Sequence, residues 1–163
     1  MKNLVLVRHA KSSWDDDGLN DFDRPLSNRG EHDAPSMAKR LKGKLHPDAM
    51  ISSAALRART TCEEFADVLK FRKSKIMTTR RLYLAEAKEI LEVVREIEGE
   101  PDCVLLFGHN PGITDFANRL LNGSIDNIPT CGVVSCKVTS DHWKDVGWGS
   151  AVLDFFDFPK KKD

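Results

Sequence analysis

Two short apolar runs in this sequence each end in a histidine, and they constrain the fold more than any other feature. They read LVLVRH over residues 4–9 and VLLFGH over residues 104–109. Apolar runs of this length are typical of strands buried in an α/β sheet. Ligands bind at the carboxyl ends of such strands, so we expect His9 and His109 to face one another across one crevice. Arg8 precedes the first histidine, and a guanidinium beside an imidazole suits a phosphate better than a metal ion.

Short apolar runs alternate with longer amphipathic stretches along the rest of the chain. This pattern predicts a three-layer α/β/α fold with a mostly parallel central sheet and an antiparallel edge. The run at 102–107 is the most hydrophobic and should be central, whereas the polar run at 75–79 should lie at or near an edge. We expect the other strands at 4–8, 49–52, 132–138 and 151–156, and helices at 27–41, 53–69, 86–98 and 111–121, with Ser27 and Ser53 as caps.

The length of 163 residues fits one domain, 1–163, whose last residues from 158 onward we expect to fray. The polar segment 9–26 is too long for an ordinary connection, and long loops at strand ends are usually functional.

Composition excludes several classes of function. The 25 Lys and Arg residues balance the 25 Asp and Glu residues, so nothing indicates a nucleic-acid partner. No apolar run approaches the ~20 residues of a membrane span. The apolar run near the amino terminus is too short for the hydrophobic region of a signal peptide. The four cysteines show no C-x-x-C spacing, which favours reduced, buried thiols. We therefore expect a cytoplasmic protein that contacts no membrane; the sequence does not indicate its oligomeric state.

A second arginine is placed to bind the same anion. Arg57 falls in the first turn of a helix that directly follows a strand, where backbone N–H groups and the helix dipole favour negative charge. Arg59 lies two positions further and should point elsewhere. Taken singly, a histidine after a strand is more often a structural residue and an arginine on a helix a solvated one. Two histidines and two arginines at predicted strand ends together predict one anion site.

Four motifs occur in the order found in one known family. They are RHAKS at 8–12, DRPLSNRG at 23–30, SAALRARTT at 53–61 and GHNP at 108–111. Together they resemble the histidine phosphatase, or phosphoglycerate mutase-like, superfamily, and the short chain with RHAKS and DRPLS looks like its SixA-type phosphohistidine phosphatase branch. The resemblance spans residues 3 to about 121. Two positions depart from the common pattern: Ala10 replaces a frequent glycine, as is often seen in this branch, and Ala54 replaces a frequent proline.

The resemblance implies a role for each motif residue. His9 would be the nucleophile that becomes a phosphohistidine intermediate, and Arg8, Arg57 and His109 would bind the phosphoryl group. Arg24 is similar to a residue that approaches the same phosphate. Ser12 would either donate its hydroxyl to the ligand or cap a local turn.

No residue of this sequence fits the role of the general acid unambiguously. Glu86 is the first candidate, and the loop aspartates Asp15 to Asp17 and Asp21 are others; each could equally be a surface or helix-start carboxylate. A phosphoramidate has a weaker bond than a phosphate ester and a leaving nitrogen that is readily protonated, so a site without a strong acid fits phosphohistidine. The short chain also leaves little length for a lid, and an open site would admit a protein side chain.

We therefore predict a metal-independent phosphatase, without a cofactor, that hydrolyses phosphohistidine through a covalent intermediate on His9. A broad-specificity phosphatase for small phosphate esters is the alternative within the same chemistry. A non-catalytic module that binds phosphorylated ligands is the alternative from a different class. The partner is accordingly a phosphorylated protein or a small phosphorylated substrate.

Overall fold

A single mixed sheet of six strands forms the middle layer of the molecule. In the computed structural model, which describes residues 1–161, the strand order is β3-β2-β4-β1-β5-β6. β3, β2, β4 and β1 run parallel, and β5 and β6 add an antiparallel edge. The strands are β1 (Lys2–Arg8), β2 (Ala49–Ser53), β3 (Met77–Thr79), β4 (Cys103–Gly108), β5 (Val133–Val138) and β6 (Ala151–Asp157). The predicted fold class is confirmed, with β4 inside the sheet and β3 at an edge.

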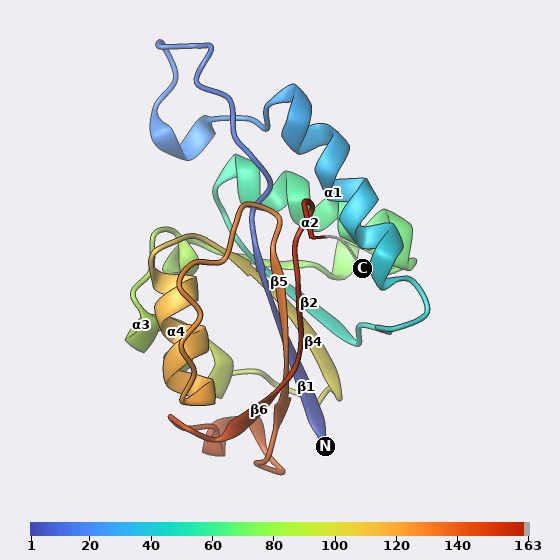
Figure 1. Cartoon of the computed structure of the whole chain (residues 1–163), viewed down its shortest axis with the longest axis vertical. Coiled ribbons are helices and arrows are strands. Elements are labelled where there is room, and N and C mark those ends of the chain that lie inside the picture. Colours follow the sequence, from blue (N-terminus) through green and yellow to red (C-terminus); the bar gives the residue numbers. More distant parts are fainter. Residues whose placement is uncertain (162–163) are drawn as a thin grey trace.

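Helices cover both faces of this sheet (Figure 1). They are α1 (Asn28–Leu41), α2 (Leu56–Leu69), α3 (Ala87–Arg95) and α4 (Gly112–Leu121). Successive side chains of β1 alternate between the faces, as the period of a strand requires. Leu4 and Leu6 pack in the core beneath α3 and α4, whereas Val5 and Val7 pack in the core beneath α1 and α2. β1 is thus buried on both sides, which explains its uninterrupted apolar run.

Many element boundaries differ from the prediction by one or two residues, and three differences concern how an element begins or ends. The strand expected at 75–79 is shortened to β3 because Lys73–Lys75 forms a 3-10 turn. α3 ends at Arg95 rather than at residue 98. Ser53 is the last residue of β2 and not the cap of α2, whose N-cap is Ala55. Ser27 does cap α1, where its Oγ accepts a hydrogen bond from the Gly30 N–H at 3.1 Å.

The long segment after β1 is organised by local structure. It contains a 3-10 turn at Asp21–Asp23, capped by the Asn20 side chain. A β-bridge between Ser12 and Leu26 closes it at its base. Gly30 of α1 packs so closely that a Cβ there would lie 2.1 Å from the Lys11 carbonyl oxygen. The loop of residues 9–12, here called the His9 loop, therefore packs directly on the first turn of α1.

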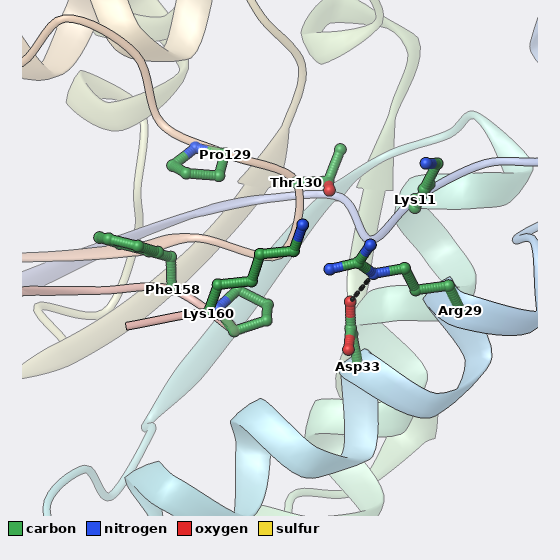
Figure 2. A pocket seen from close by; sticks show the side chains of 8 residues that line it. Lys11, Arg29, Asp33, Pro129, Thr130, Phe158 and Lys160 are labelled. Carbon is green, nitrogen blue, oxygen red and sulfur yellow. Dashed lines mark ion pairs between the residues drawn. The ribbon is translucent and has the colours of Figure 1, made fainter. Parts of the chain in front are cut away.

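The start of the tail that the sequence predicts to fray is held against α1. The Arg40 guanidinium donates hydrogen bonds to the carbonyl oxygens of Phe158 and Pro159, at 2.9 and 2.7 Å, and pairs with Asp157 at 3.1 Å. Residues 162–163 of that tail lie outside the described residues. Between the tail, α1 and the His9 loop lies a pocket of about 270 Å³, here called the α1 pocket (Figure 2). It is lined by Lys11, Arg29, Asp33, Pro129, Thr130, Phe158, Pro159 and Lys160.

The four cysteines are free and buried, as predicted. Within residues 1–161, no helix has the length and apolar character that crossing a membrane requires.

Candidate active site

The two strand-end histidines face one another, as the sequence predicts. β1 and β4 are parallel neighbours, with Arg8 in register with Gly108, so the residues that follow lie side by side. The ring centroids of His9 and His109 are 5.2 Å apart. Both rings are almost fully buried, with 7% and 2% of each residue exposed. The two imidazole rings are therefore buried next to one another at the strand ends.

His9 is held in one tautomer. Its Nδ1 lies 2.7 Å from the carbonyl oxygen of Ala10, and because a carbonyl only accepts, Nδ1 carries the proton. Burial and the positive charges of Arg57, Arg8 and Arg24 lower the pKa of His9 to about 4, despite the opposing effect of the Ala10 bond. The imidazole is therefore neutral near pH 7. Its Nε2 lone pair is free for attack.

The backbone around His9 is fixed from the antiparallel side of the sheet. Cys131, which precedes β5, lies in the left-handed region with φ of 60°. Few non-glycine residues adopt this conformation. Its N–H is shared between the carbonyl oxygens of Arg8 and His9, each at 3.0 Å. The His9 N–H in turn donates to the Gly108 carbonyl oxygen at 3.1 Å.

Two buried polar atoms at these strand ends have no hydrogen-bond partner, and they are the Arg8 Nε and the His109 Nδ1. Among the described residues no other buried side-chain nitrogen or oxygen is left in this state. Leaving such groups unpaired is costly, so native structures seldom do it without a functional reason. Both atoms belong to residues that the sequence assigns to the anion site.

The other nitrogen of His109 is occupied. Its Nε2 lies 2.7 Å from the Ser53 Oγ, which already accepts a hydrogen bond from the Ala55 N–H at 3.2 Å. A serine hydroxyl that accepts one hydrogen bond can also donate its own proton, and donation to Nε2 would leave the imidazole proton on Nδ1. Burial, followed by the charges of neighbouring groups, lowers the pKa of His109 to about 3. His109 is therefore neutral near pH 7, and its Nδ1 has no partner.

Asp21 joins the two arginines that come from different segments. Arg57, in the first turn of α2 and 4% exposed, donates to the Asp21 backbone carbonyl oxygen at 2.6 Å and to its Oδ2 at 2.9 Å. Arg24 donates to Oδ1 at 2.9 Å, and the Tyr83 hydroxyl donates to Oδ2 at 2.5 Å. Although burial opposes it, hydrogen bonds from Tyr83, Arg57 and Arg24 lower the pKa of Asp21 to about 2. Asp21 is thus an anion held by the same guanidinium groups that the sequence assigns to phosphate.

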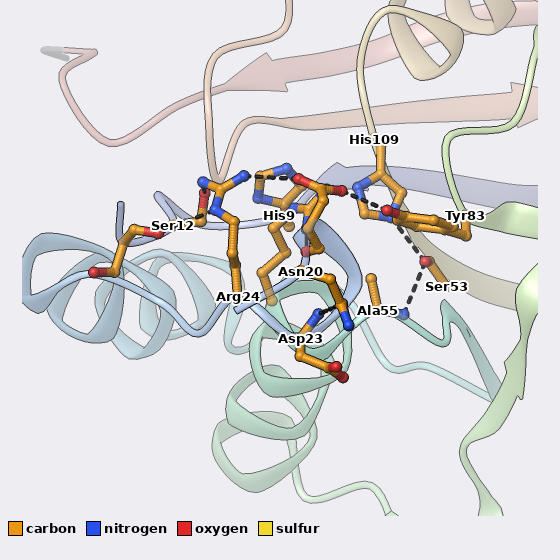
Figure 3. Close-up of polar contacts among 12 residues, drawn as sticks. His9, Ser12, Asn20, Asp23, Arg24, Ser53, Ala55, Tyr83 and His109 are labelled. Atoms are coloured by element: carbon orange, nitrogen blue, oxygen red, sulfur yellow. Dashed lines mark hydrogen bonds and ion pairs between the residues drawn. The ribbon is translucent and has the colours of Figure 1, made fainter. Parts of the chain in front are cut away.

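Arg24 is fixed by the loop that carries Ser12. Its guanidinium contacts the Ser12 Oγ, donates from Nε to the Ser13 carbonyl oxygen at 3.0 Å and stacks 3.2 Å from the centre of the Trp14 ring. Figure 3 shows Arg24, Tyr83 and His109 beside His9 from separate segments, with Ser12 on the segment that carries His9 itself. In this structure the Ser12 hydroxyl oxygen accepts a hydrogen bond from Arg24.

Thr61 connects the His9 loop to the helix of Arg57. Its Oγ1 accepts a hydrogen bond from the Ala10 N–H at 2.9 Å and donates to the Arg57 carbonyl oxygen at 2.8 Å. Sequence reasoning did not assign Thr61, Tyr83 or Ser53 to the site. The Thr61 position within the SAALRARTT motif, four residues after Arg57, is a signal that could have found it.

Glu86 lies apart from this cluster. It is exposed at the N-cap of α3 and lines a separate cavity of about 580 Å³ with Pro111, Asp115 and Arg119. It forms no hydrogen bond to the residues around His9. Arg59 points elsewhere, as predicted, and donates to the Ala54 carbonyl oxygen at 2.9 Å.

The remaining candidate acids, Asp15 to Asp17, are exposed residues of the loop. In the part of the chain that the structure describes, no three His, Cys, Asp or Glu side chains are grouped to hold a metal ion.

Two histidines and two arginines lie together at the strand ends of a sheet that helices cover on both faces. This arrangement defines the phosphoglycerate mutase-like class of α/β proteins. The chain belongs to the histidine phosphatase superfamily (branch 1), which it matches over residues 4–83. A chloroplastic protein of Arabidopsis thaliana, described as uncharacterized, is 34% identical over 154 residues, covering 88% of this chain and 70% of the relative. An uncharacterized protein of Mycobacterium tuberculosis is 31% identical and covers 94% of this chain and all of the relative.

Solved structures show the same fold. SixA from Agrobacterium tumefaciens superposes with a TM-score of 0.83 at 24% identity, covering 97% of this chain and 98% of the other. A protein histidine phosphatase SixA complexed with tungstate gives 0.81 at 22% identity, covering 96% and 97%. A mycobacterial glucosyl-3-phosphoglycerate phosphatase gives 0.70 at 18% identity, covering 94% and 97%. The fold is therefore shared by proteins named for different substrates, so the substrate has to be argued from the site.

Proposed function

We propose that this protein is a metal-independent phosphohistidine phosphatase that uses His9 as its nucleophile. The observation that carries the proposal is the state of His9: a neutral imidazole whose Nδ1–H is bound to the Ala10 carbonyl oxygen. Its Nε2 is free, and the neighbouring Arg8 and His109 each have an unpartnered buried nitrogen. A phosphoryl group would supply the missing acceptors. Membership of the histidine phosphatase superfamily supports the same reading.

In the first step, the Nε2 lone pair of His9 attacks phosphorus while the P–N bond of the substrate breaks. The electron pair of that bond stays on the substrate imidazole, which takes up a proton from solvent. Arg8, Arg57 and His109 stabilise the charge on the three equatorial oxygens. In the second step water attacks the phosphorylated His9, the P–Nε2 bond breaks, and inorganic phosphate leaves with the histidine restored.

The acids near the site favour a phosphoramidate over an ester. Asp21 is the carboxyl group closest to the arginines, and with a pKa of about 2 it is ionised near pH 7 and holds no proton to donate. An alkoxide leaving group needs such a proton, whereas a leaving imidazole is stable once it has been protonated from water. SixA structures with the same fold are described as phosphohistidine or protein histidine phosphatases, which supports this choice.

A broad phosphatase for small phosphate esters is the second candidate. It is favoured by the likeness of fold to a glucosyl-3-phosphoglycerate phosphatase and by the exposed Glu86, which lines a cavity together with Pro111. A Glu86→Gln variant separates the two candidates. Hydrolysis of a phosphohistidine peptide should be unchanged in this variant, and a loss of ester hydrolysis would identify Glu86 as an acid.

The direct test is to trap the intermediate. Incubation with a labile phosphate donor followed by a denaturing gel should show a phosphoenzyme that is stable in alkali and labile in acid. His9→Gln should abolish it, and His32→Gln, which changes an exposed histidine on α1, should not. Failure to trap any phosphoenzyme, together with loss of turnover on adding a chelator, would refute the proposal.

The arginine pair Arg57 and Arg59 offers a second matched comparison. Arg57→Ala should lower kcat by about 10²- to 10³-fold, as loss of a preorganised donor to a developing charge does. Arg59→Ala removes a guanidinium two residues away that bonds to Ala54, and should leave kcat near the wild-type value. Equal effects of the two substitutions would exclude Arg57 from the phosphoryl pocket.

A further inference from the structure

We propose that the α1 pocket binds an acidic segment of the phosphorylated protein substrate. This inference rests on the proposed function and adds a site for a second part of the same substrate. Three cationic side chains, from Lys11, Arg29 and Lys160, line the pocket against one carboxylate, from Asp33. The whole chain has a formal net charge of zero, so this excess is a local feature. Local positive potential of this kind attracts carboxylates.

The single carboxylate of the pocket is already neutralised. Asp33 Oδ2 lies 3.5 Å from the Arg29 Nε, one turn earlier on α1. Within residues 1–161, neither the Lys11 nor the Lys160 ammonium is paired with a carboxylate. Figure 2 shows the Lys160 side chain reaching toward Thr130 across the space that Arg29 borders on the other side. The two ammonium groups are therefore left to bind an external anion.

The pocket is a built part of the fold. Arg40 on α1 donates hydrogen bonds to the carbonyl oxygens of Phe158 and Pro159. These bonds place the next residue, Lys160, at the rim of the α1 pocket. On the opposite wall, Thr130 directly precedes Cys131, whose N–H is bonded to the carbonyl oxygens of Arg8 and His9. The walls are thus anchored at both ends of the pocket.

The pocket lies close to the nucleophile along the chain. Lys11 is two residues from His9, and its carbonyl oxygen accepts hydrogen bonds from the Ser27 N–H and hydroxyl at 2.9 and 3.1 Å. An extended peptide spans about 3.3 to 3.6 Å per residue. A phosphohistidine inserted at His9 would therefore carry the residues next to it in sequence toward this cationic rim.

The character of the walls favours a carboxylate side chain over a second phosphate group. Pro129, Phe158 and Pro159 supply an apolar surface that suits the methylene groups of a glutamate or aspartate. Two of the three cations are lysines, which act as point charges, and the third, Arg29, is paired through its Nε with Asp33 at 3.5 Å. An acidic peptide uses both the apolar wall and the ammonium groups.

The test compares three substrates on the full chain: phosphoimidazole, a phosphohistidine peptide flanked by glutamates, and the same peptide flanked by glutamines. The wild-type protein should have a lower KM for the acidic peptide than for the neutral one, and the difference should shrink as salt is added. The Lys11→Gln, Lys160→Gln double variant should raise the KM for the acidic peptide by about threefold to tenfold, the sum expected for two exposed ion pairs. Its KM for the neutral peptide and its rate with phosphoimidazole should not change.

Lys161→Gln is the matched control, because this neighbouring lysine does not line the pocket and donates to the Phe156 carbonyl oxygen at 2.7 Å. It should leave all three substrates unaffected. Equal KM values for the acidic and neutral peptides in the wild type, or an equal effect of Lys161→Gln, would overturn the inference while the phosphatase activity stands. If inorganic phosphate competes at the pocket but acidic peptides do not, the site binds phosphate instead and the inference is wrong. Absence of turnover with all three substrates would instead refute the proposed function.

Discussion

The two buried histidines should make the stability of the fold depend steeply on pH. In the folded protein the pKa of His9 is about 4 and that of His109 about 3, against an ordinary value of 6.5. As the pH falls below 6.5, the unfolded chain binds protons that the folded chain excludes. Protonation then favours the unfolded state, so the free energy of unfolding decreases as the solution becomes more acidic.

The size of the effect follows from the two pKa differences. Between pH 7.5 and pH 5.5 each histidine accounts for about 1.4 kcal/mol, so the pair should lower the free energy of unfolding by about 3 kcal/mol. This is a large share of the ~5–15 kcal/mol that stabilises a typical domain. Asp21, with a pKa of about 2, stays ionised throughout this range and contributes nothing to the change.

Urea denaturation followed by tryptophan fluorescence at the two pH values measures this difference. A double variant, His9→Gln with His109→Gln, should lose most of the pH dependence, whereas His32→Gln, which changes an exposed histidine, should keep it. A decrease smaller than about 1 kcal/mol in the wild type would refute the reasoning. So would an undiminished decrease in the double variant.

Three further substitutions test how the site is held together. Thr61→Val keeps the side-chain shape but leaves the buried Ala10 N–H without its acceptor, so chemical denaturation should show a loss of about 1–3 kcal/mol. Gly30→Ala places a methyl group 2.1 Å from the Lys11 carbonyl oxygen, and the backbone shift it forces should cost at least about 1–3 kcal/mol in the same assay and lower kcat. Asp21→Asn removes the anion held by the guanidinium groups, so inhibition by tungstate should strengthen about tenfold; weaker inhibition would show that Asp21 instead holds those groups in place.

The sequence predicts the fold and four residues of the site because their signals are local. A buried parallel strand has a continuous apolar run, and the residue after it lies at the carboxyl edge of the sheet, which places Arg8, His9 and His109. Arg57 follows from its position in the first turn of a helix after β2. These four residues require no knowledge of how the loops fold.

The rest of the site depends on contacts between distant segments. Asp21 and Tyr83 are 62 residues apart, and their hydrogen bond depends on the path of the long loop after β1. No periodicity in the sequence encodes that path. Ser53 shows a different limit of prediction from sequence. A serine before a helix is normally its N-cap, but here the Ser53 hydroxyl is hydrogen-bonded to His109, which follows the neighbouring strand β4. Tertiary contacts decided its role.

The strand order determines when the site can form during synthesis. β4 lies between β1 and β2, so a nascent chain that ends before residue 103 has no strand to join the segment of His9 to the segment of Arg57. Cys131, whose N–H is bonded to the backbone of Arg8 and His9, emerges later still. Synthesis must therefore pass residue 131 before the backbone of His9 is held in place. Until then a ribosome-bound chain lacks the assembled site, which forms only when the sheet closes.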